Sequence, residues 1–460
     1  MAFTGTGGTC GAGEENERIA KRGSPENFSM LRAIVFNAKM TYLLYMENMK
    51  KQLLDRFIRY VKTWTTSNQD NADNGIIPSE TREADFAETL ADELRKIGLT
   101  DVHVTEHAYV CGRIPASKGF EKAPVIGFLA HMDTVAEVSG KDVKPAVIEN
   151  YDGKPVSIGN GITLDPASDK DLAESKGQTI ITTDGSTLLG ADDKAGIAAI
   201  MTAIEHIMSD GTINHGTIEV IFSPDEETGH GMDFVPTDWL TAKQCYTLDG
   251  GKEAELEVEC FNAYKSEITF TGIAMHTGTA RPGMVNSISM ASSFISMLPH
   301  SERPETTDKY QGFYAPMDIS GSIEQSHVVL YLRDFSAEGM KKRLETVDAL
   351  ANAIQYKFPG GKAKVVHTKQ YLNMKEELDK NPAVVEKLVK ATELAGVKPT
   401  FNPIRGGTDG SRLTEMGIPT PNVFTGGHNF HSRSEWASLD QMMTAVKTVI
   451  ELVKLWAEDK

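Results

Sequence analysis

Apolar residues recur at helical spacing in several long stretches of the chain. The clearest run follows a short turn at 187–196 and consists of Ile197, Ile200, Met201, Ile204 and Ile207. Similar apolar faces occupy 47–64, 82–97 and 440–456. This spacing predicts helices in which at least one face is buried. The turn at 187–196 therefore leads into a buried helix, and Asp192 and Asp193 lie at its N-terminus.

Short, continuous apolar runs lie between the helical stretches. They cover 124–130, 217–222 and 245–248, and a shorter one covers 422–424. Runs of this length between turn residues predict strands buried on both faces. Alternation of such strands with helices predicts an α/β fold in which a mixed, mostly parallel sheet is covered by helices.

The order of elements changes between 261 and 372. Strands are predicted at 267–271, 326–332 and 363–369, with helices between them at 285–298 and 338–358. This order predicts a separate, smaller α+β domain inserted into the first. The expected organisation is a main domain in two parts, 46–260 and 373–460, an insert at 261–372, and an N-terminal extension at 1–45 without regular structure.

Composition and charge narrow the classes of partner. The chain has 47 Lys and Arg against 64 Asp and Glu, a net charge of −17, which argues against nucleic acid or an anionic membrane as a partner. No apolar run approaches the length of a membrane span. The 4 cysteines are scattered and form no Cys-x-x-Cys pair, which is typical of reduced thiols in a cytoplasmic protein.

Acidic residues and a histidine gather at the ends of the predicted strands and in the 187–196 turn. They are His131, Asp133, Asp192, Glu226, Glu227 and Asp249. Open α/β sheets bind ligands at the carboxyl ends of their strands, so these side chains are expected to converge. Like charges about 4 Å apart repel by roughly 4 kcal/mol at an effective dielectric near 20. Two divalent cations would remove this repulsion, and His, Asp and Glu ligands suit zinc, with cobalt or manganese as alternatives.

Each of these signals has an ordinary structural interpretation when it stands alone. Asp192 at a helix start is more often a cap than a ligand. The pair 226–227 is more often a solvated acidic pair, and Asp249 before two glycines is more often a turn residue. His431 alone is more often a polar loop residue. Only their joint placement at strand ends favours a metal centre.

Several segments resemble one family of enzymes. They are His131-Met-Asp133-Thr, Gly190-Ala-Asp192-Asp-Lys-Ala-Gly196, Asp225-Glu226-Glu227-Thr-Gly229 and Leu248-Asp249-Gly. Together they are similar to the di-zinc metallopeptidase family that includes aminoacylases and glutamate carboxypeptidases. Fuller strings at 187–196, 403–410 and 426–432 resemble the tripeptide aminopeptidases within that family. The resemblance runs from about Met46 to the C-terminus.

The resemblance implies a set of metal ligands. Asp192 would bridge two divalent metal ions, most simply Zn²⁺. His131 and Asp249 would complete one site, and Glu227 and His431 would complete the other. The main domain would then be the catalytic domain and the insert a lid.

The resemblance also implies catalytic and substrate-binding roles. Glu226 would be the general base that acts on a water between the metals, and Asp133 would orient His131. His276 in the insert is a candidate oxyanion donor, with Asn286 nearby. Arg405, in a glycine-rich loop, is suited to capture a peptide carboxylate.

The function implied is a cytoplasmic aminopeptidase that releases the N-terminal residue of tripeptides, so its partners are small peptides. The alternatives are a dipeptidase or an acylamino-acid deacylase of the same family, and a non-catalytic scaffold that binds metal or peptide. An intact Glu226 argues against the scaffold, because a binder needs the ligands but not the base. Pairing of two chains through the insert is left open by the sequence.

Overall fold

The computed structural model describes residues 25–459. The chain forms two compact units, of which one ends at Gln52 and the other is Leu53–Lys460. Helix α2, Pro25–Val61, begins well before the predicted start at 47. Residues 25–45, which were expected to lack regular structure, are therefore helical, and no Gly or Pro interrupts the sequence from 26 to 61. The rest of the predicted extension, 1–24, lies outside the described residues.

The main sheet of the larger unit has 8 strands in the order β1-β2-β8-β3-β9-β16-β10-β15. Their bounds are β1 Thr100–Val104, β2 Val110–Ile114, β8 Ile218–Ser223, β3 Ile126–His131, β9 Gln244–Gly250, β16 Asn422–Phe424, β10 Glu255–Glu257 and β15 Thr400–Phe401. The centre of the sheet, from β8 through β3 and β9 to β16, is parallel, whereas β1, β2 and β10 add antiparallel pairings. The predicted α/β fold with a mixed sheet is thus confirmed.

Two helices pack directly on this sheet, and two more pack on them or on each other. They are α4 Thr81–Ile97, α6 Ala191–Ser209, α10 Pro382–Leu394 and α12 Leu439–Ala457. Helix α6 packs on β3 and β9, and α12 packs on α6 and α10. Gly196 permits the closest approach, because a Cβ atom at this position would lie 1.9 Å from the carbonyl oxygen of Leu248 in β9. This packing holds the first turn of α6 against the carboxyl end of β9.

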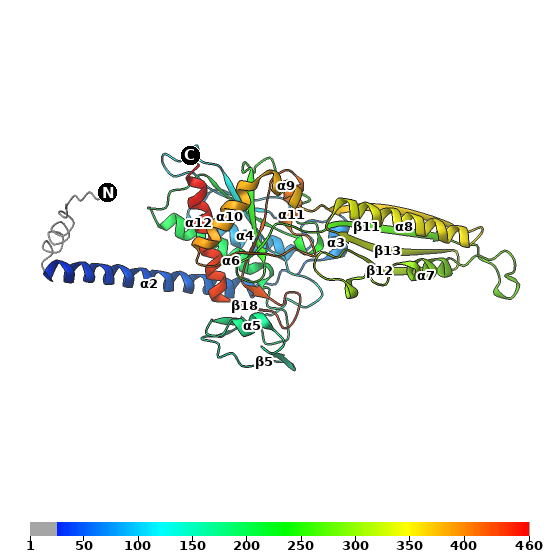
Figure 1. The fold of residues 1–460 in the computed structure, drawn as a ribbon, viewed down its shortest axis with the longest axis horizontal. Coiled ribbons are helices and arrows are strands. Elements are labelled where there is room, and N and C mark those ends of the chain that lie inside the picture. Colours follow the sequence, from blue (N-terminus) through cyan, green and yellow to red (C-terminus); the bar gives the residue numbers. More distant parts are fainter. Residues whose placement is uncertain (1–24, 460) are drawn as a thin grey trace, which may run out of the picture. The chain divides into compact units, whose positions relative to one another are not determined.

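The predicted insert, 261–372, has a sheet of its own (Figure 1). Its strand order is β12-β13-β11-β14. Its strands, β12 Phe313–Gly321, β13 Gln325–Asp334, β11 Asn262–Thr271 and β14 Lys362–Tyr371, are all antiparallel. Helices α7, Ser287–Met297, and α8, Ala337–Lys357, cover one face and form a core with Val328, Leu330 and Leu332. Strand β12 was not predicted, because most of this edge strand is exposed and Pro316 interrupts its apolar pattern.

An excursion from the main domain, between 138 and 186, forms small sheets. It contains β4 Ala146–Ile148, β5 Val156–Gly159, β6 Ile162–Leu164, α5 Lys170–Glu174 and β7 Ile180–Thr182. Strand β7 pairs with β18, Trp436–Ser438, which pairs in turn with β17, Gly427–His428. The excursion thereby fixes both ends of the loop that carries His431.

Short elements complete the described chain. They are α3 Gln69–Asp73, η1 Glu226–Thr228, η2 Thr277–Thr279, η3 Pro304–Thr306, α9 Lys375–Lys380 and α11 Asp409–Glu415. Among residues 25–459, no helix combines the length and the apolar character that a membrane crossing requires.

Candidate metal centre

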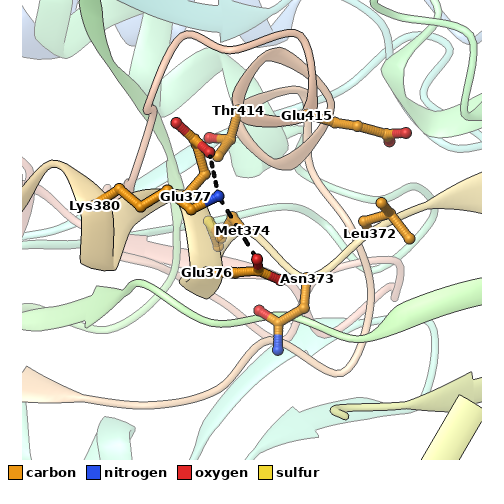
Figure 2. Close-up of a pocket in the computed structure, with 8 residues that line it drawn as sticks. All are labelled: Leu372, Asn373, Met374, Glu376, Glu377, Lys380, Thr414 and Glu415. Carbon is orange, nitrogen blue, oxygen red and sulfur yellow. Dashed lines mark hydrogen bonds and ion pairs between the residues drawn. The ribbon is translucent and has the colours of Figure 1, made fainter. Parts of the chain in front are cut away.

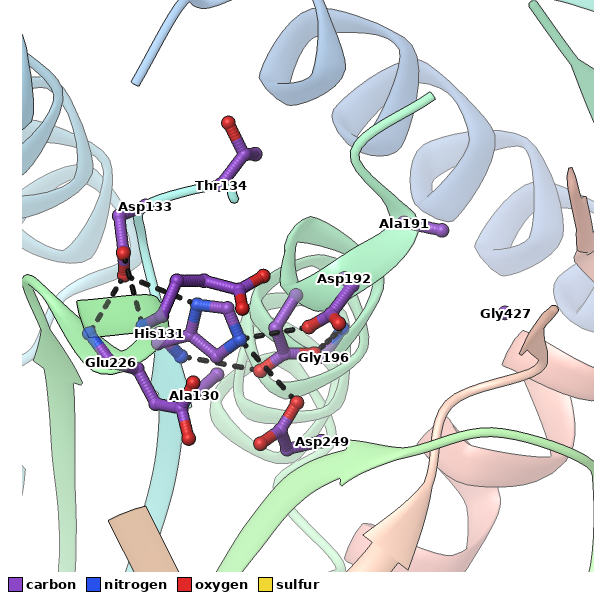
Figure 3. A network of polar contacts seen from close by, with 12 residues as sticks. Ala130, His131, Asp133, Thr134, Ala191, Asp192, Gly196, Glu226, Asp249 and Gly427 are labelled. Atoms are coloured by element: carbon purple, nitrogen blue, oxygen red, sulfur yellow. Dashed lines mark hydrogen bonds and ion pairs between the residues drawn. The ribbon is translucent and has the colours of Figure 1, made fainter. Parts of the chain in front are cut away.

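Residues from three strand ends and one helix start meet at one edge of the main sheet (Figure 3). His131 is the last residue of β3, and Asp249 lies near the end of β9. Glu226 and Glu227 open η1, just after β8. Asp192 is in the first turn of α6, where its backbone is not helical (φ −83°, ψ 105°). The parallel register of the sheet centre therefore brings these side chains together, as expected for the carboxyl edge of such a sheet.

Asp192 lies between two histidines. Its Oδ1 is 2.8 Å from Nε2 of His131, and its Oδ2 is 3.1 Å from Nε2 of His431. His131 is buried, whereas the His431 side chain is 45% exposed. The two oxygens of one carboxylate thus face two imidazoles that lie 300 residues apart in the chain.

A second carboxylate accompanies each histidine. Oδ1 of Asp249 lies 3.4 Å from Nε2 of His131, and Oε1 of Glu227 lies 3.1 Å from Nε2 of His431. Each half of the centre therefore contains one imidazole, one carboxylate of its own and one oxygen of Asp192. Ligand atoms of His131, Asp192 and Glu227 all lie within 4.8 Å of one another.

Asp133 supports both halves from behind. Its Oδ1 accepts a hydrogen bond from the backbone N–H of Glu226 (3.0 Å), and its Oδ2 accepts one from that of Glu227 (3.2 Å). Oδ1 is also 3.3 Å from Nδ1 of His131. Since Asp133 is fully buried, it fixes the imidazole and η1 relative to each other.

Burial and neighbouring charges shift the pKa values of the acidic groups in the centre. Burial and the charge of Asp192 raise the pKa of Glu227 to about 8, and burial above all raises that of Asp249 to about 6. Burial also acts to raise the pKa of Asp192, but hydrogen bonds from the two histidines outweigh it and hold that pKa below its ordinary value. The same contacts, with Asp192 and Glu227, raise the pKa of His431 to about 11.

The donor set fits two divalent ions. It offers two imidazole nitrogens and three carboxylates, the ligand types that zinc, cobalt and manganese accept. Oε1 of Glu227 is buried and makes no hydrogen bond of proper geometry among the described residues, although His431 lies close to it. A buried oxygen of this kind is costly unless a cation or a proton satisfies it.

A pocket of about 360 Å³ opens onto the centre. It is lined by Asp192, Glu226, Glu227, Asp249, Gly407, Thr408, Phe430 and His431. All of these residues come from the main domain. The pocket therefore joins the candidate ligands and Glu226 to the glycine-rich loop at 403–410.

Comparisons with known proteins identify the family of this chain. Residues 182–455 match the model of the peptidase family M20/M25/M40. A protein named Peptidase T from Clostridium perfringens is 44% identical over 408 residues, which cover 89% of this chain and 100% of the relative. Another Peptidase T, from Halothermothrix orenii, is 43% identical over 408 residues, 88% of this chain and 99% of the relative. The chain belongs to this family of peptidases.

Solved structures show the same fold. An aminopeptidase PepT from Bacillus cereus aligns with a TM-score of 0.69 and 23% identity over 89% of this chain and 99% of its own. A tripeptidase from Staphylococcus aureus aligns with a TM-score of 0.71 and 22% identity over the same shares. The family model and the relatives at 43–44% identity confirm the family resemblance inferred from the motifs, so this chain is a peptidase.

The three predicted substrate-binding residues of this peptidase lie outside the lining of the central pocket. His276 is exposed, and its Nδ1 accepts a hydrogen bond from the N–H of Gly278 (3.1 Å). The Asn286 side chain caps α7 by accepting a hydrogen bond from the N–H of Ile288 (2.9 Å). Both residues belong to the insert, and these hydrogen bonds join them to the backbone of the insert itself and not to the candidate ligands.

Arg405 differs more sharply from its predicted role. Its Nη1 donates to the carbonyl oxygens of Lys309 (2.6 Å) and Gln311 (2.9 Å), and its Nη2 donates to Oγ1 of Thr307 (2.9 Å). The guanidinium also lies 5.1 Å from the ring centre of Phe261. Arg405 therefore fastens the 307–311 loop of the insert to the main domain, and a substrate carboxylate would have to displace these partners.

Sequence reasoning assigned no role to three buried residues that support the centre. Asp193 accepts hydrogen bonds from the backbone N–H groups of His131 (3.2 Å) and Gly196 (3.1 Å). Asn422 accepts one from the N–H of Asp249 (3.0 Å). Glu435 accepts one from the N–H of Ala191, the first residue of α6 (2.8 Å). Only Asp193 adjoins a motif residue, so the sequence carried little signal for the other two.

A second pocket, of about 220 Å³, lies where β14 leads into α9 (Figure 2). Its charged groups are already paired, since Lys380 lies 3.1 Å from Glu377 and Arg412 lies 3.4 Å from Glu415. None of the predicted site residues lines it. The central pocket is therefore the site at which chemistry is expected.

Proposed function

We propose that this chain is a metal-dependent aminopeptidase that releases the N-terminal residue of tripeptides. The observation that carries the proposal is the position of Asp192, whose two oxygens face His131 and His431 separately. A carboxylate in this position would bridge two metal ions. Relatives named Peptidase T, at 43–44% identity over nearly their whole length, support the substrate class.

The geometry of the two halves supports the following ligand roles. His131, Asp249 and Asp192 would hold one ion, and Glu227, His431 and Asp192 would hold the other. We propose Zn²⁺ in both sites, with Co²⁺ or Mn²⁺ as substitutes, on the basis of the donor types. When bound, such ions lower the pKa of a water and polarise a carbonyl.

Glu226 would move the proton in this reaction. Its carboxyl group lines the pocket beside the ligands, and burial raises its pKa well above the ordinary value. A group of this kind can take a proton from the attacking water and deliver it to the leaving amine. Asp133 would keep this residue in place through the backbone N–H of Glu226, and would keep the imidazole of His131 oriented at the same time.

The insert would complete the site around the rest of the peptide. A tripeptide is at most about 10 Å long, so its carboxyl end would lie near the 403–410 loop when its amine lies near the metals. We propose that the insert acts as a lid that brings His276 towards the scissile carbonyl, with Asn286 nearby. Capture of the terminal carboxylate by Arg405 would require release of the 307–311 loop.

Two further proposals concern the setting of the enzyme. The cysteines within residues 25–459, Cys111, Cys245 and Cys260, are free, which fits a cytoplasmic location that fractionation of the source cells would test. Pairing of two chains through the insert would use the free edge of β12, where Met317 and Ile319 are exposed. Light scattering of the wild type and of a Met317→Lys variant would detect it.

Peptide-length profiling tests the function. Purified zinc-loaded protein would be given di-, tri- and tetrapeptides, each with a free and an acetylated N-terminus. We expect free tripeptides to be cleaved fastest and a chelator to abolish cleavage. Faster cleavage of dipeptides, or of acetylated substrates, would replace the proposal with a dipeptidase or a deacylase. Two bound metals without any cleavage would indicate a binding scaffold.

A further inference from the structure

The turn that carries Asp192 is held by a single buried carboxylate. Oε2 of Glu435 accepts hydrogen bonds from the backbone N–H groups of Leu189 (2.7 Å) and Gly190 (2.8 Å). Its Oε1 accepts two more, from those of Ala191 (2.8 Å) and Asp192 (3.2 Å). Glu435 is 1% exposed, so water contributes little to these contacts. Four consecutive peptide groups thus point into one side chain.

This turn needs such a support. The first N–H groups of a helix have no partner within it, and here the backbone of Asp192 and Asp193 departs from helical geometry. The N–H groups at the start of α6 therefore need acceptors from outside the helix. A negative charge at this end of α6 is also favoured by the helix dipole. The orientation of the Asp192 side chain thus depends on the residue that binds residues 189–192.

Glu435 also belongs to the segment that carries His431. It lies four positions after His431 and directly before β18, whose Trp436 pairs with Thr182 of β7. One side chain therefore connects the loop of one histidine to the turn of the central carboxylate. Because the two oxygens of Asp192 face different histidines, a small rotation of this turn would change the distances in both halves of the centre.

We propose that Glu435 is a positioning residue that sets the Asp192 carboxylate between the two metal sites. The inference rests on the proposed function, in which Asp192 bridges two ions. The role requires a carboxylate, since a carboxylate has acceptors only, whereas an amide would turn a donor towards two N–H groups. Residues that orient metal ligands from behind typically contribute tenfold to a hundredfold in metal affinity or activity.

Glu219 offers a matched control. It is equally buried, and its carboxylate accepts hydrogen bonds from the backbone N–H groups of Thr241 and Ala242 (2.9 Å each). It also pairs with Arg113, at 2.8 Å. However, it lies at the opposite end of β8 from Ser223, roughly 13 Å away at about 3.3 Å per residue. Glu219→Gln therefore removes a buried, N–H-binding carboxylate that holds no part of the centre.

The experiment compares Co²⁺ binding by the full-length wild type, Glu435→Gln and Glu219→Gln. Affinities come from calorimetric titration of the metal-free proteins, and coordination geometry comes from the visible absorption of the bound Co²⁺. We expect Glu435→Gln to bind Co²⁺ about tenfold to a hundredfold more weakly, with an altered spectrum. Glu219→Gln should lower the melting temperature but keep the wild-type affinity and spectrum.

Each outcome decides the proposal. Wild-type affinity and spectrum in Glu435→Gln would overturn it, and so would an equal loss in Glu219→Gln, which would indicate a general folding effect. If Glu435→Gln does not fold, Glu435→Asp takes its place, since it keeps the charge but shortens the side chain by one methylene. An unchanged Co²⁺ spectrum and affinity in that variant would also overturn the proposal. Failure of the wild type to bind two metals would instead refute the proposed function.

Discussion

Replacement of Glu226 by Gln separates proton transfer from metal binding. The change keeps the size of the side chain and leaves the backbone N–H of residue 226 bonded to Asp133 (3.0 Å). Among the described residues, the groups close enough to share a metal ion include Glu227 but not Glu226. Glu226→Gln should therefore leave both metal sites intact while it removes the group that carries the proton.

The expected loss is large in turnover and small in metal content. General acid–base catalysis typically contributes a factor of about 10² to 10⁴, which corresponds to roughly 2.7–5.4 kcal/mol in the activation barrier. The neighbouring substitution Glu227→Gln serves as the control. It changes the same kind of side chain one position away, but it removes a carboxylate whose Oε1 lies 3.1 Å from Nε2 of His431. That variant should lose activity together with metal.

The assay pairs steady-state kinetics on a free tripeptide with elemental analysis of the dialysed protein. Glu226→Gln should retain two metal ions per chain and show a kcat lower by the factor given above. If Glu226→Gln loses metal as Glu227→Gln does, then Glu226 is a ligand and the division of the pair is wrong. If its kcat stays within about threefold of the wild type, another group carries the proton.

Further tests follow from the pKa shifts and from the packing. In the metal-free protein, the raised pKa values of Glu227 (about 8) and His431 (about 11) mean that the folded state holds protons which the unfolded chain has released. Stability should therefore fall as the pH rises from about 6.5 to 8, with a declining melting temperature in calorimetry, and a flat profile would contradict the assignment. Arg405→Ala should raise KM for free tripeptides about tenfold to a hundredfold, equivalent to about 1.4–2.7 kcal/mol, and have little effect on amidated ones. Equal effects on both substrates would leave Arg405 as a fastener of the 307–311 loop only. Gly196→Ala should destabilise the fold by about 1–3 kcal/mol or more in denaturant unfolding, because its Cβ would lie 1.9 Å from the carbonyl oxygen of Leu248. Wild-type stability in that variant would mean that α6 can shift away from β9.

Local periodicity by itself predicts much of the fold. The predicted strand at 422–424 has the observed bounds of β16, and the turn at 187–196 does lead into the buried helix α6. These elements are readable because burial of a strand or a helix face imposes a spacing on nearby residues. The edge strand β12 imposes no such spacing, since most of it is exposed, and it was therefore missed.

The motifs likewise identified the family, because each combines chemical groups at short, fixed separations. Beyond the metal ligands that the resemblance implies, they could not show which distant groups share a contact. Glu435 lies more than 240 residues from the turn that it binds, and no local pattern distinguishes it from other acidic residues. Arg405 had the side chain expected of a carboxylate binder, yet its hydrogen bonds go to carbonyl oxygens of the insert.

The sequence shows which elements form but not which distant side chains meet, and this difference has a physical cause. A residue type and its neighbours in sequence determine what a side chain can donate, accept or ligate. The order and register of the strands determine which partner it meets, and here the pairing of β7 with β18 sets the loop of His431 beside the start of α6. The sequence alone therefore determined the elements and the chemistry available at their ends, whereas only the tertiary structure decided that Asp192 faces two histidines and that Glu435 holds it there.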